Sequence, residues 1–343
     1  MRLVHKCEFS PPLPMSTVRR MTQLRHRNAL RSRRQLADLD SIFRRYGVDF
    51  EPVSTSWARS EAVFSALADS LVSFPSTPEI VILGSVARHE AVPLSDLDYV
   101  VLCPPGNADQ VSGRIADILA GICDKFGLNG TRRSSLMGAA VDFGKLVDSI
   151  GKPEDGTHAL TWRVLSFAEG ARIRDGDTSL TDFKRLVFER YVRSAMQGSL
   201  MLIGEAELSK YWMTLVLETN SKLSDDPLVN ADRWFKTAIT RRITLVSCML
   251  CLWSSQRAPQ RELRSLMSTP PIYRISKLLR LNLFENTEDI LEEICTVFSK
   301  YLVVWGDRPF DVTYHDDRLR LAQRCSDVLA EAVRRFGMPQ LLR

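Results

Sequence analysis

The sequence lacks a hydrophobic run of the ~20 residues that a bilayer-spanning helix needs. Its most apolar window, Ile243 to Trp253, is shorter and is bounded by Arg241-Arg242 and Gln256-Arg257, so it predicts a buried helix. The sequence also lacks a cysteine framework, because the 7 cysteines are odd in number and scattered. This use of cysteine is typical of a reducing compartment. We therefore expect a cytoplasmic protein with no membrane partner.

Cys248 and Cys251 have the one CxxC spacing in the chain. They lie within the apolar pattern VSCMLCLW, without a second CxxC and without a histidine close by in the sequence. The pattern predicts two buried core thiols, which pack like small apolar side chains, rather than a metal or redox pair.

Acidic residues are nearly absent from residues 1–35, where Glu8 is the one acid among many arginines. Such a segment is compatible with a basic arm that binds nucleic acid or another acidic partner. It is also compatible with an arginine-rich transit peptide. A third interpretation is an exposed leader to a helix, for which a misplaced start codon would be an explanation because Met15 and Met21 follow closely. We favour the leader, and we expect the proline-rich residues 1–14 to be irregular.

Strand signals are nearly absent after residue 176, so the chain divides into a mixed part and a helical part. A length of 343 residues suits two units. We expect an α+β fold with a basic N-terminal arm and helix at 1–50, a small mixed β-sheet core with flanking helices at 51–176, and an all-α domain at 177–343. Apolar spacing predicts helices at 16–46, 54–72, 110–126, 157–171, 179–203, 205–223, 231–255, 286–305 and 314–336, and strands at 80–83, 99–102 and 136–143.

The segment 79–103 carries the chemistry of the mixed part. An apolar run ends at Gly84-Ser85, and after residues 86–95 the carboxylates of Asp96 and Asp98 lead into a second apolar run. On a strand, residues i and i+2 point to the same face, so these two carboxylates project together. They repel each other unless a cation lies between them, and oxygen ligands suit Mg²⁺ or Mn²⁺. The pair therefore predicts a metal site of the kind used in phosphoryl or nucleotidyl transfer.

The Gly84-Ser85 turn supplies a second feature of a nucleotide site. Glycine permits a tight turn and a close approach of the backbone to phosphate. A short helix through Arg88 would present free N–H groups to a triphosphate at its N-terminus. The Ser85 hydroxyl and the Arg88 guanidinium would add a hydrogen bond and a charge. Neither a Gly-Ser pair nor a DxD motif is specific by itself. Nucleotide binding is predicted by their order, in which a strand leads to Gly-Ser and, after a gap, the DxD motif leads into a second strand.

The stretch GSVARHEAVPLSDLDYVVL, residues 84–102, resembles the active-site signature of the DNA polymerase β-type nucleotidyltransferase superfamily. Within it, the stretch is most similar to the N-terminal domain of the uridylyltransferases that modify the PII signal protein, and to their stand-alone relatives. A weaker similarity covers GTHALTWRVLSFAEGARIRDG, residues 156–176, where that group has a helix and a turn after the catalytic sheet. The resemblance implies that Gly84 and Ser85 hold nucleotide phosphates and that Asp96 and Asp98 ligate the metal ions.

The third carboxylate of the family usually lies on a later strand, and Asp142 in the predicted strand AAVDF is our choice for it. Asp148 and Asp124 are alternatives, although Asp124 falls in a predicted helix. As the third acid, Asp142 would ligate the metal at the acceptor hydroxyl and help to deprotonate that hydroxyl. The later pair His315-Asp316 has no partner histidines at workable spacing and predicts only the polar start of the last helix.

In the helical part, Arg233 and Lys236 lie three residues apart and share one face of a predicted helix. From this face Lys236 could reach a triphosphate across a cleft, although a solvated helix face would give the same pattern. Arg241 and Arg242 are further candidate cations. The neighbouring Trp234 and Phe235 are expected in the core rather than as a platform for base stacking.

These features predict a nucleotidyltransferase that depends on Mg²⁺ or Mn²⁺. It would transfer an NMP from an NTP such as ATP or UTP to a hydroxyl of a protein or small molecule, and release pyrophosphate. One alternative is a nucleic-acid-directed transferase, such as a tRNA-modifying toxin or an oligonucleotide synthase, which the basic N-terminal segment favours. Another is a non-catalytic module that binds nucleotide or a partner. The sequence indicates neither the base nor the acceptor.

Overall fold

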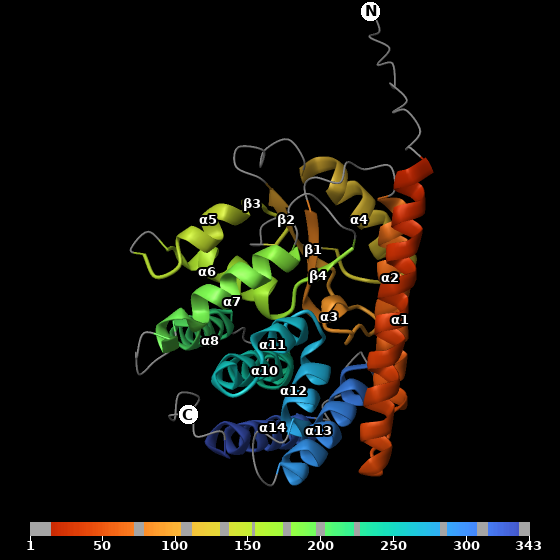
Figure 1. The fold of residues 1–343 in the computed structure, drawn as a ribbon. Helices are drawn as coiled ribbons and strands as arrows, with labels where there is room; N and C mark the ends of the chain where they lie inside the picture. The colour runs from red at the N-terminus through yellow and green to blue at the C-terminus, as the bar shows by residue number, and fades with distance from the viewer. Residues whose placement is uncertain are drawn as a thin grey trace, which may run out of the picture.

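A computed structural model describes residues 15–71, 79–103, 112–130, 137–152, 155–173, 180–196, 203–222, 227–281, 287–306 and 315–335. Within these ranges the chain is mainly helical with one 4-stranded mixed sheet, which agrees with the expected α+β fold (Figure 1). The strands are β1 (Glu79–Leu83), β2 (Asp98–Cys103), β3 (Ala140–Asp142) and β4 (Ala171–Arg172). The first helices are α1 (Met15–Arg45), α2 (Glu51–Ser70), α3 (Gly84–Ala87), α4 (Ser112–Phe126), α5 (Phe143–Asp148) and α6 (Thr157–Ala168). The later ones are α7 (Leu180–Met196), α8 (Ile203–Ser221), α9 (Pro227–Lys236), the π-helix η2 (Thr237–Arg241), α10 (Arg242–Trp253), the 3₁₀-helix η3 (Ser254–Gln256), α11 (Gln260–Leu266), α12 (Pro271–Arg280), α13 (Glu288–Gly306) and α14 (His315–Arg335).

The structure contains elements that the sequence pattern does not predict, namely α5, α11, α12 and β4. The expected strand at 136–143 shortens to β3 because Asp142 caps α5, where its Oδ1 accepts a hydrogen bond from the Lys145 N–H at 3.1 Å. Pro271 begins α12, since proline fits the first turn of a helix. The two residues of β4 form a strand only because they pair with β1.

The sheet has the order β3-β2-β1-β4. β1 is antiparallel to β2, with Leu83 opposite Asp98, whereas β3 is parallel to β2, with Asp142 opposite Cys103. Asp98 and Asp142 therefore lie at opposite ends of β2.

Both faces of the sheet are covered by helices. Val81 and Val100 belong to a hydrophobic cluster that includes α6 and the helical half of the chain. Ile82 and Val101, on the other face, pack in a second cluster with residues of α2 and α4. Because both faces are buried, β1 and β2 are continuous apolar runs rather than alternating patterns.

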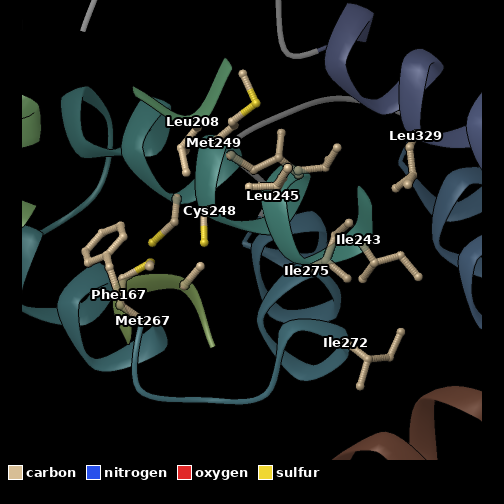
Figure 2. Packing of buried hydrophobic residues seen from close by; sticks show 14 of the residues in the cluster. Phe167, Leu208, Ile243, Leu245, Cys248, Met249, Met267, Ile272, Ile275 and Leu329 are labelled. Atoms are coloured by element: carbon tan, nitrogen blue, oxygen red, sulfur yellow. The ribbon is translucent and has the colours of Figure 1, made fainter. Parts of the chain in front are cut away.

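The helical half has α10 at its centre, and residues 243–252 of this helix are all buried (Figure 2). A helix that is apolar on all sides has to be surrounded by other elements. Cys248 and Cys251 are buried free thiols in this helix, which confirms the prediction of core cysteines. None of the helices in the described ranges combines the length and the apolar character that a membrane crossing requires.

The first hydrophobic cluster extends across the predicted boundary at residue 176. It contains Phe43 of α1, Val100 of the sheet, Ile243 of α10 and Leu329 of α14. Figure 1 shows α1 running along both the sheet-bearing part and the helical part. The boundary therefore separates two kinds of secondary structure, but it does not separate two hydrophobic cores.

Candidate active site

Gly84 and Asp98 meet at the end of the sheet where β1 passes into α3. Gly84 has φ of +70°, in the left-handed region that favours glycine. A Cβ atom on Gly84 would lie 2.7 Å from Oδ2 of Asp98, so the carboxylate packs directly against the glycine backbone. Glycine is needed here for two reasons, its backbone angle and the close approach of a carboxylate. The expected tight turn and the short helix after it are both present.

Asp96 lies two residues before β2 and forms an isolated β-bridge with Asn129. The Asn129 N–H donates to the Ser95 carbonyl oxygen at 2.9 Å, and the Leu97 N–H donates to the Asn129 carbonyl oxygen at 3.0 Å. These two bonds on either side of Asp96 fix its backbone. Its side chain is 49% exposed, and Oδ2 lies 3.6 Å from Nζ of Lys236.

A cavity of about 240 Å³ opens beside Asp96. Lys236 of α9 and Trp305 of α13 line it, and the Lys236 ammonium lies 5.6 Å from the centroid of the Trp305 ring. Arg233 and Asp232 also line it, and Asp232 forms an ion pair with Arg318 at 2.7 Å. The structure thus brings Lys236, Arg233 and Asp96 together, as residues of one cavity between the sheet and the helical half.

The charges of Asp98 and Lys236 are only partly compensated. Burial raises the pKa of the Asp98 carboxyl, against the opposing influence of Lys236 and Arg241. Burial likewise lowers the pKa of Lys236, against the opposing influence of Asp96. Since each group in its charged form would be stabilised by an added opposite charge, the site favours both a cation near Asp98 and an anion near Lys236.

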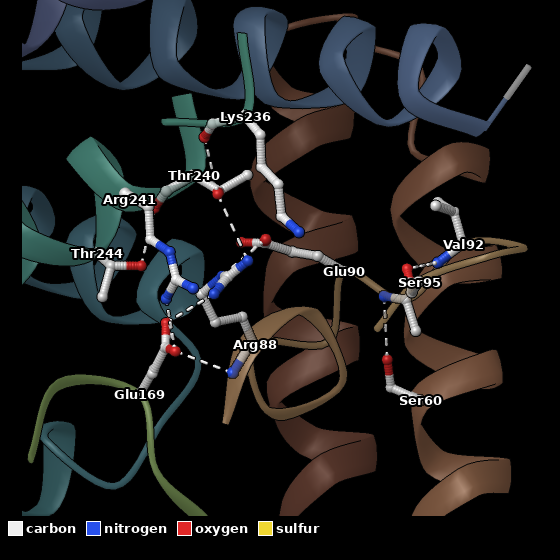
Figure 3. A network of polar contacts seen from close by, with 12 residues as sticks. Ser60, Arg88, Glu90, Val92, Ser95, Glu169, Lys236, Thr240, Arg241 and Thr244 are labelled. Carbon is white, nitrogen blue, oxygen red and sulfur yellow. Dashed lines mark hydrogen bonds and ion pairs between the residues drawn. The ribbon is translucent and has the colours of Figure 1, made fainter. Parts of the chain in front are cut away.

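A buried charge network lies behind the turn and links it to the helical half (Figure 3). Arg88 forms ion pairs with Glu90 at 2.8 Å and with Glu169 at 2.6 Å, and all three side chains are fully buried. Oε1 of Glu169 also accepts hydrogen bonds from the Gly84 N–H at 2.9 Å and from Arg241 at 2.7 Å. Burial alone would raise the pKa of Glu169, but Arg241 and Arg88 lower it to about 2. Glu169 is thus an ionised link between α3 and η2.

Lys236 and Arg241 both reach this region because η2 is a π-helix. In an α-helix, residues five positions apart point about 140° away from each other, whereas the wider π turn, with i→i+5 bonds, places them on one face. Thr240, in the same turn, donates to the Lys236 carbonyl oxygen at 3.0 Å and accepts from Arg88 at 3.4 Å. The π turn therefore presents one cation to Asp96 and another to Glu169.

Two of the predicted phosphate contacts have other partners in the structure. The Arg88 guanidinium is fully buried between two glutamates, so it holds the turn together instead of facing a ligand. The Gly84 N–H donates to Glu169, so it does not present a free donor. Ser85 is buried in α3. Of the four residues predicted to bind nucleotide, Lys236 is the one that lines the cavity.

Asp142 does not join Asp96 and Asp98. It pairs with Cys103, five residues along β2 from Asp98, which corresponds to roughly 16 Å. It also shares a strand face with Cys103, the face opposite to that of Asp98, because side chains alternate along a strand. We expected a third ligand here because β3 follows β2, but the register places this carboxylate at the wrong end and on the wrong face.

The other candidates lie outside the cavity. Asp124 and Asp148 are exposed on α4 and α5, and Arg242 faces the ring of Trp212 at 4.9 Å. Phe235 is buried in the core, as predicted, whereas Trp234 is only partly buried.

The sequence pattern alone does not assign a role at this site to Glu169, Thr240 or Trp305. Glu169 stands in the weakly similar segment 156–176, as a lone acid between apolar residues and Gly170, and this pattern is compatible with a buried charge. Thr240 and Trp305 carry no sequence signal, since a threonine or a tryptophan on an apolar helix is ordinary core composition.

The donor set at Asp96 and Asp98 fits one magnesium ion that also takes water and substrate phosphates. Mg²⁺ is commonly bound through one or two carboxylates in this way. A site made of protein ligands alone does not fit, because no group of three or more His, Cys, Asp or Glu residues in the described ranges could hold a metal.

Comparison with known proteins adds no relative, since no protein-family model matches this chain and no curated protein matches it either.

Proposed function

We propose that this protein is a magnesium-dependent nucleotidyltransferase that acts at the cavity beside Asp96. The observation that carries the proposal is the contact between Gly84 and Asp98. A carboxylate packed at 2.7 Å from the position of a missing Cβ requires glycine at this turn. It lies beside a half-exposed carboxylate, Asp96, and a largely buried lysine, Lys236, which both line a cavity suited to a small charged substrate.

Each residue has a distinct role in the proposal. Asp96 and Asp98 would hold the ion, and Lys236 would exchange its contact with Asp96 for one with the triphosphate. Glu169 would act as a positioning residue, since it holds the Gly84 N–H and Arg241 in place. Bound Mg²⁺ would offset charge on the phosphates and make the acceptor hydroxyl more acidic.

The reaction is a transfer of a nucleotidyl group. The acceptor oxygen would attack the α-phosphorus of an NTP, and the bond from that phosphorus to the bridging oxygen of pyrophosphate would break. Pyrophosphate leaves with the electron pair of that bond, and the acceptor proton passes to solvent. The acceptor would be a hydroxyl of a protein or of a small molecule.

A second candidate function is a non-catalytic module that binds nucleotide. The position of Asp142 favours it, because this candidate for the third carboxylate of the polymerase β-type reaction pairs at the other end of β2 from Asp98. Such a module would bind NTP in the presence of Mg²⁺ without turnover.

The experiment is an incubation of the purified chain with labelled NTPs, Mg²⁺ and fractionated lysate as the source of acceptors, with pyrophosphate release as the measurement. Asp96→Asn combined with Asp98→Asn should lower the rate by about 100-fold or more, the scale of losing a principal transition-state charge contact. Asp148→Asn, at an exposed aspartate away from the cavity, is the matched control and should leave the rate unchanged.

Calorimetric titration of NTP distinguishes the two candidate functions. Binding that needs Mg²⁺, with no pyrophosphate released in any fraction, identifies the non-catalytic module. Activity that survives the double substitution contradicts the assignment of both aspartates, and absence of NTP binding contradicts both candidates.

A further inference from the structure

A second cavity, of about 330 Å³, shares no lining residue with the cavity beside Asp96. Its walls come from α1, α2, α7 and the segment 169–173. Cavities of this size lie at the lower end of the range for small-molecule sites. The space therefore suits a small organic molecule.

Lys184 of α7 lines this cavity with a side chain that is almost entirely removed from solvent. The residue is 5% exposed, and Nζ donates to the Met267 carbonyl oxygen at 2.8 Å. An ammonium group has three donors, and no carboxylate of the described residues forms an ion pair with Lys184. Burial lowers its pKa to about 7, and the neighbouring Arg274 and Arg31 act in the same direction. A buried lysine in this setting is stabilised by an anion.

Two arginines add positive charge to the same cavity. Arg31 of α1 and Arg172 of β4 both line it, and Arg31 donates to the Ser265 carbonyl oxygen at 3.1 Å. Burial and then the charge of Arg172 lower the pKa of Arg31. An anionic group near Arg31 would offset both effects.

The carboxylates at the cavity wall are already engaged. Glu61 accepts a hydrogen bond from the Ser32 hydroxyl at 2.7 Å and lies 2.8 Å from Nε2 of His89. Glu169 is held by Arg88, Arg241 and the Gly84 N–H, as described above. Neither glutamate therefore compensates the charge of Lys184 directly.

The rest of the lining is mixed, with polar residues such as Gln35 and Thr269 beside an apolar part. Phe64, Ala68, Ile173 and Leu180 line the cavity, and the Phe64 ring stacks on His89 at 5.8 Å between ring centroids. A ligand that fits this space would have an apolar body as well as a charged group.

We propose that this cavity is a binding site for a small organic anion, whose carboxylate or phosphate group contacts Lys184 and Arg31 and whose apolar part packs against Phe64 and Ile173. The proposal does not rest on the transferase activity, because the two cavities share no lining residue. Glu169 nevertheless lines this cavity and also holds the Gly84 turn.

The test uses the full chain and four probes, namely benzoate, phenyl phosphate, inorganic phosphate and the neutral analogue benzamide, in calorimetric titrations. Benzoate or phenyl phosphate should bind at one site per chain, and benzamide should not. Lys184→Met and Arg31→Gln should each weaken binding about tenfold or more, the scale of losing a charge-assisted hydrogen bond. Lys222→Met, at an exposed lysine of the helical half, is the matched control and should bind as the parent does.

The affinity for benzoate should also depend on pH. Because the pKa of Lys184 is about 7 without ligand, an anion that prefers the charged lysine should bind more tightly at pH about 6 than at pH about 9. Among the described residues, Arg274 and Arg31 act electrostatically to lower the pKa of Lys184, and Cys248 and Glu169 act to raise it. Lys184→Met should remove most of the pH dependence. The same substitution should not lower the unfolding temperature, since it removes a buried charge without leaving a cavity. An unfolding temperature equal to that of the parent chain would confirm that the variant is folded.

The proposal fails if no anionic probe shows saturable binding, or if Lys184→Met binds as tightly as the parent chain. Binding of inorganic phosphate as tight as that of phenyl phosphate would overturn the role of the apolar wall. Asp175 and Asp177 stand in the adjoining segment 174–179, which lies outside the described residues. Binding that appears only after both are changed to Asn would show that the chain's own carboxylates fill the site, and it would also overturn the proposal.

Discussion

Gly84 combines a positive φ with the close approach of a carboxylate, whereas Gly47 shows only the first of these features. Gly47 shares its positive φ, at +64°, but a Cβ there would meet nothing within 4 Å. At Gly84 a Cβ would meet the Asp98 carboxylate at 2.7 Å. A comparison of the two positions therefore separates the backbone requirement from the requirement for close approach.

We expect Gly47→Ala to lower the free energy of unfolding by about 1–2 kcal/mol, the strain of a left-handed residue with a Cβ. Gly84→Ala should add roughly 1–3 kcal/mol to that loss, since Asp98 has to move. Unfolding in urea measures the free energy of unfolding of both variants. In an Asp98→Ala background, the extra loss of unfolding free energy caused by Gly84→Ala should disappear. If the two glycine substitutions cost the parent chain the same free energy, the close contact between Gly84 and Asp98 is contradicted.

The helical segment from Pro227 to Trp253 passes through α9, η2 and α10, and its π turn sets the direction of Lys236 relative to Arg241. Thr237–Arg241 contains one residue more than a regular α-helical path would need. Such insertions persist at functional sites because they redirect side chains on either side of the turn.

Deletion of Ala238 should restore a regular α-helix and rotate α9 by about 100° relative to α10. Lys236 would then point away from Asp96. Mg²⁺-dependent NTP binding should therefore weaken as much as it does in the Lys236→Met variant. The helix content measured by circular dichroism should stay the same. Ala238→Ser keeps the chain length and is the control. NTP binding that survives the deletion would show that the π turn does not position Lys236.

Of the two hydrophobic clusters in the described residues, the first joins the sheet to the helical half. Phe43, Val100 and Ile243 belong to it, although they stand in the three segments that the sequence predicts as separate units. The buried ion pair between Arg88 and Glu169, and the contact of Glu169 with Arg241, join the same parts through charges.

We therefore expect the chain to unfold in a single cooperative transition, with fluorescence and circular dichroism giving the same midpoint. Fragments 1–176 and 177–343, each made alone, should lack a cooperative transition because each exposes half of the shared core. A fragment 177–343 that unfolds sharply by itself would contradict this expectation.

Much of the local structure could be predicted from the sequence. The spacing of apolar residues predicts α1, α2 and α4 closely, and the apolar runs around Gly84 and Asp98 predict β1 and β2. These predictions succeed because they depend on local patterns, such as amphipathic periodicity and the glycine and proline residues that interrupt helices and strands. The buried state of Cys248 and Cys251 follows from the same reasoning, since α10 is apolar on every side.

The candidate site could be predicted only in part. The pair Asp96 and Asp98 and the special turn at Gly84 come from local spacing, but the roles of Asp142 and Arg88 depend on register and on distant partners. Asp142 lies at the far end of β2 because β3 pairs in parallel at that position. Arg88 is turned inward because Glu169, 81 residues away, is buried beside it.

The sequence by itself determined the α+β character, the turn at Gly84 and the two adjacent carboxylates, because each depends on residues close together in the chain. The tertiary structure decided which charges meet. It brought Lys236 to Asp96 and Arg241 to Glu169 through one π turn, and it enclosed Lys184 in a second cavity. Burial and long-range pairing set these contacts, since the energy of a charge depends on the groups that surround it in space and not on its neighbours in sequence.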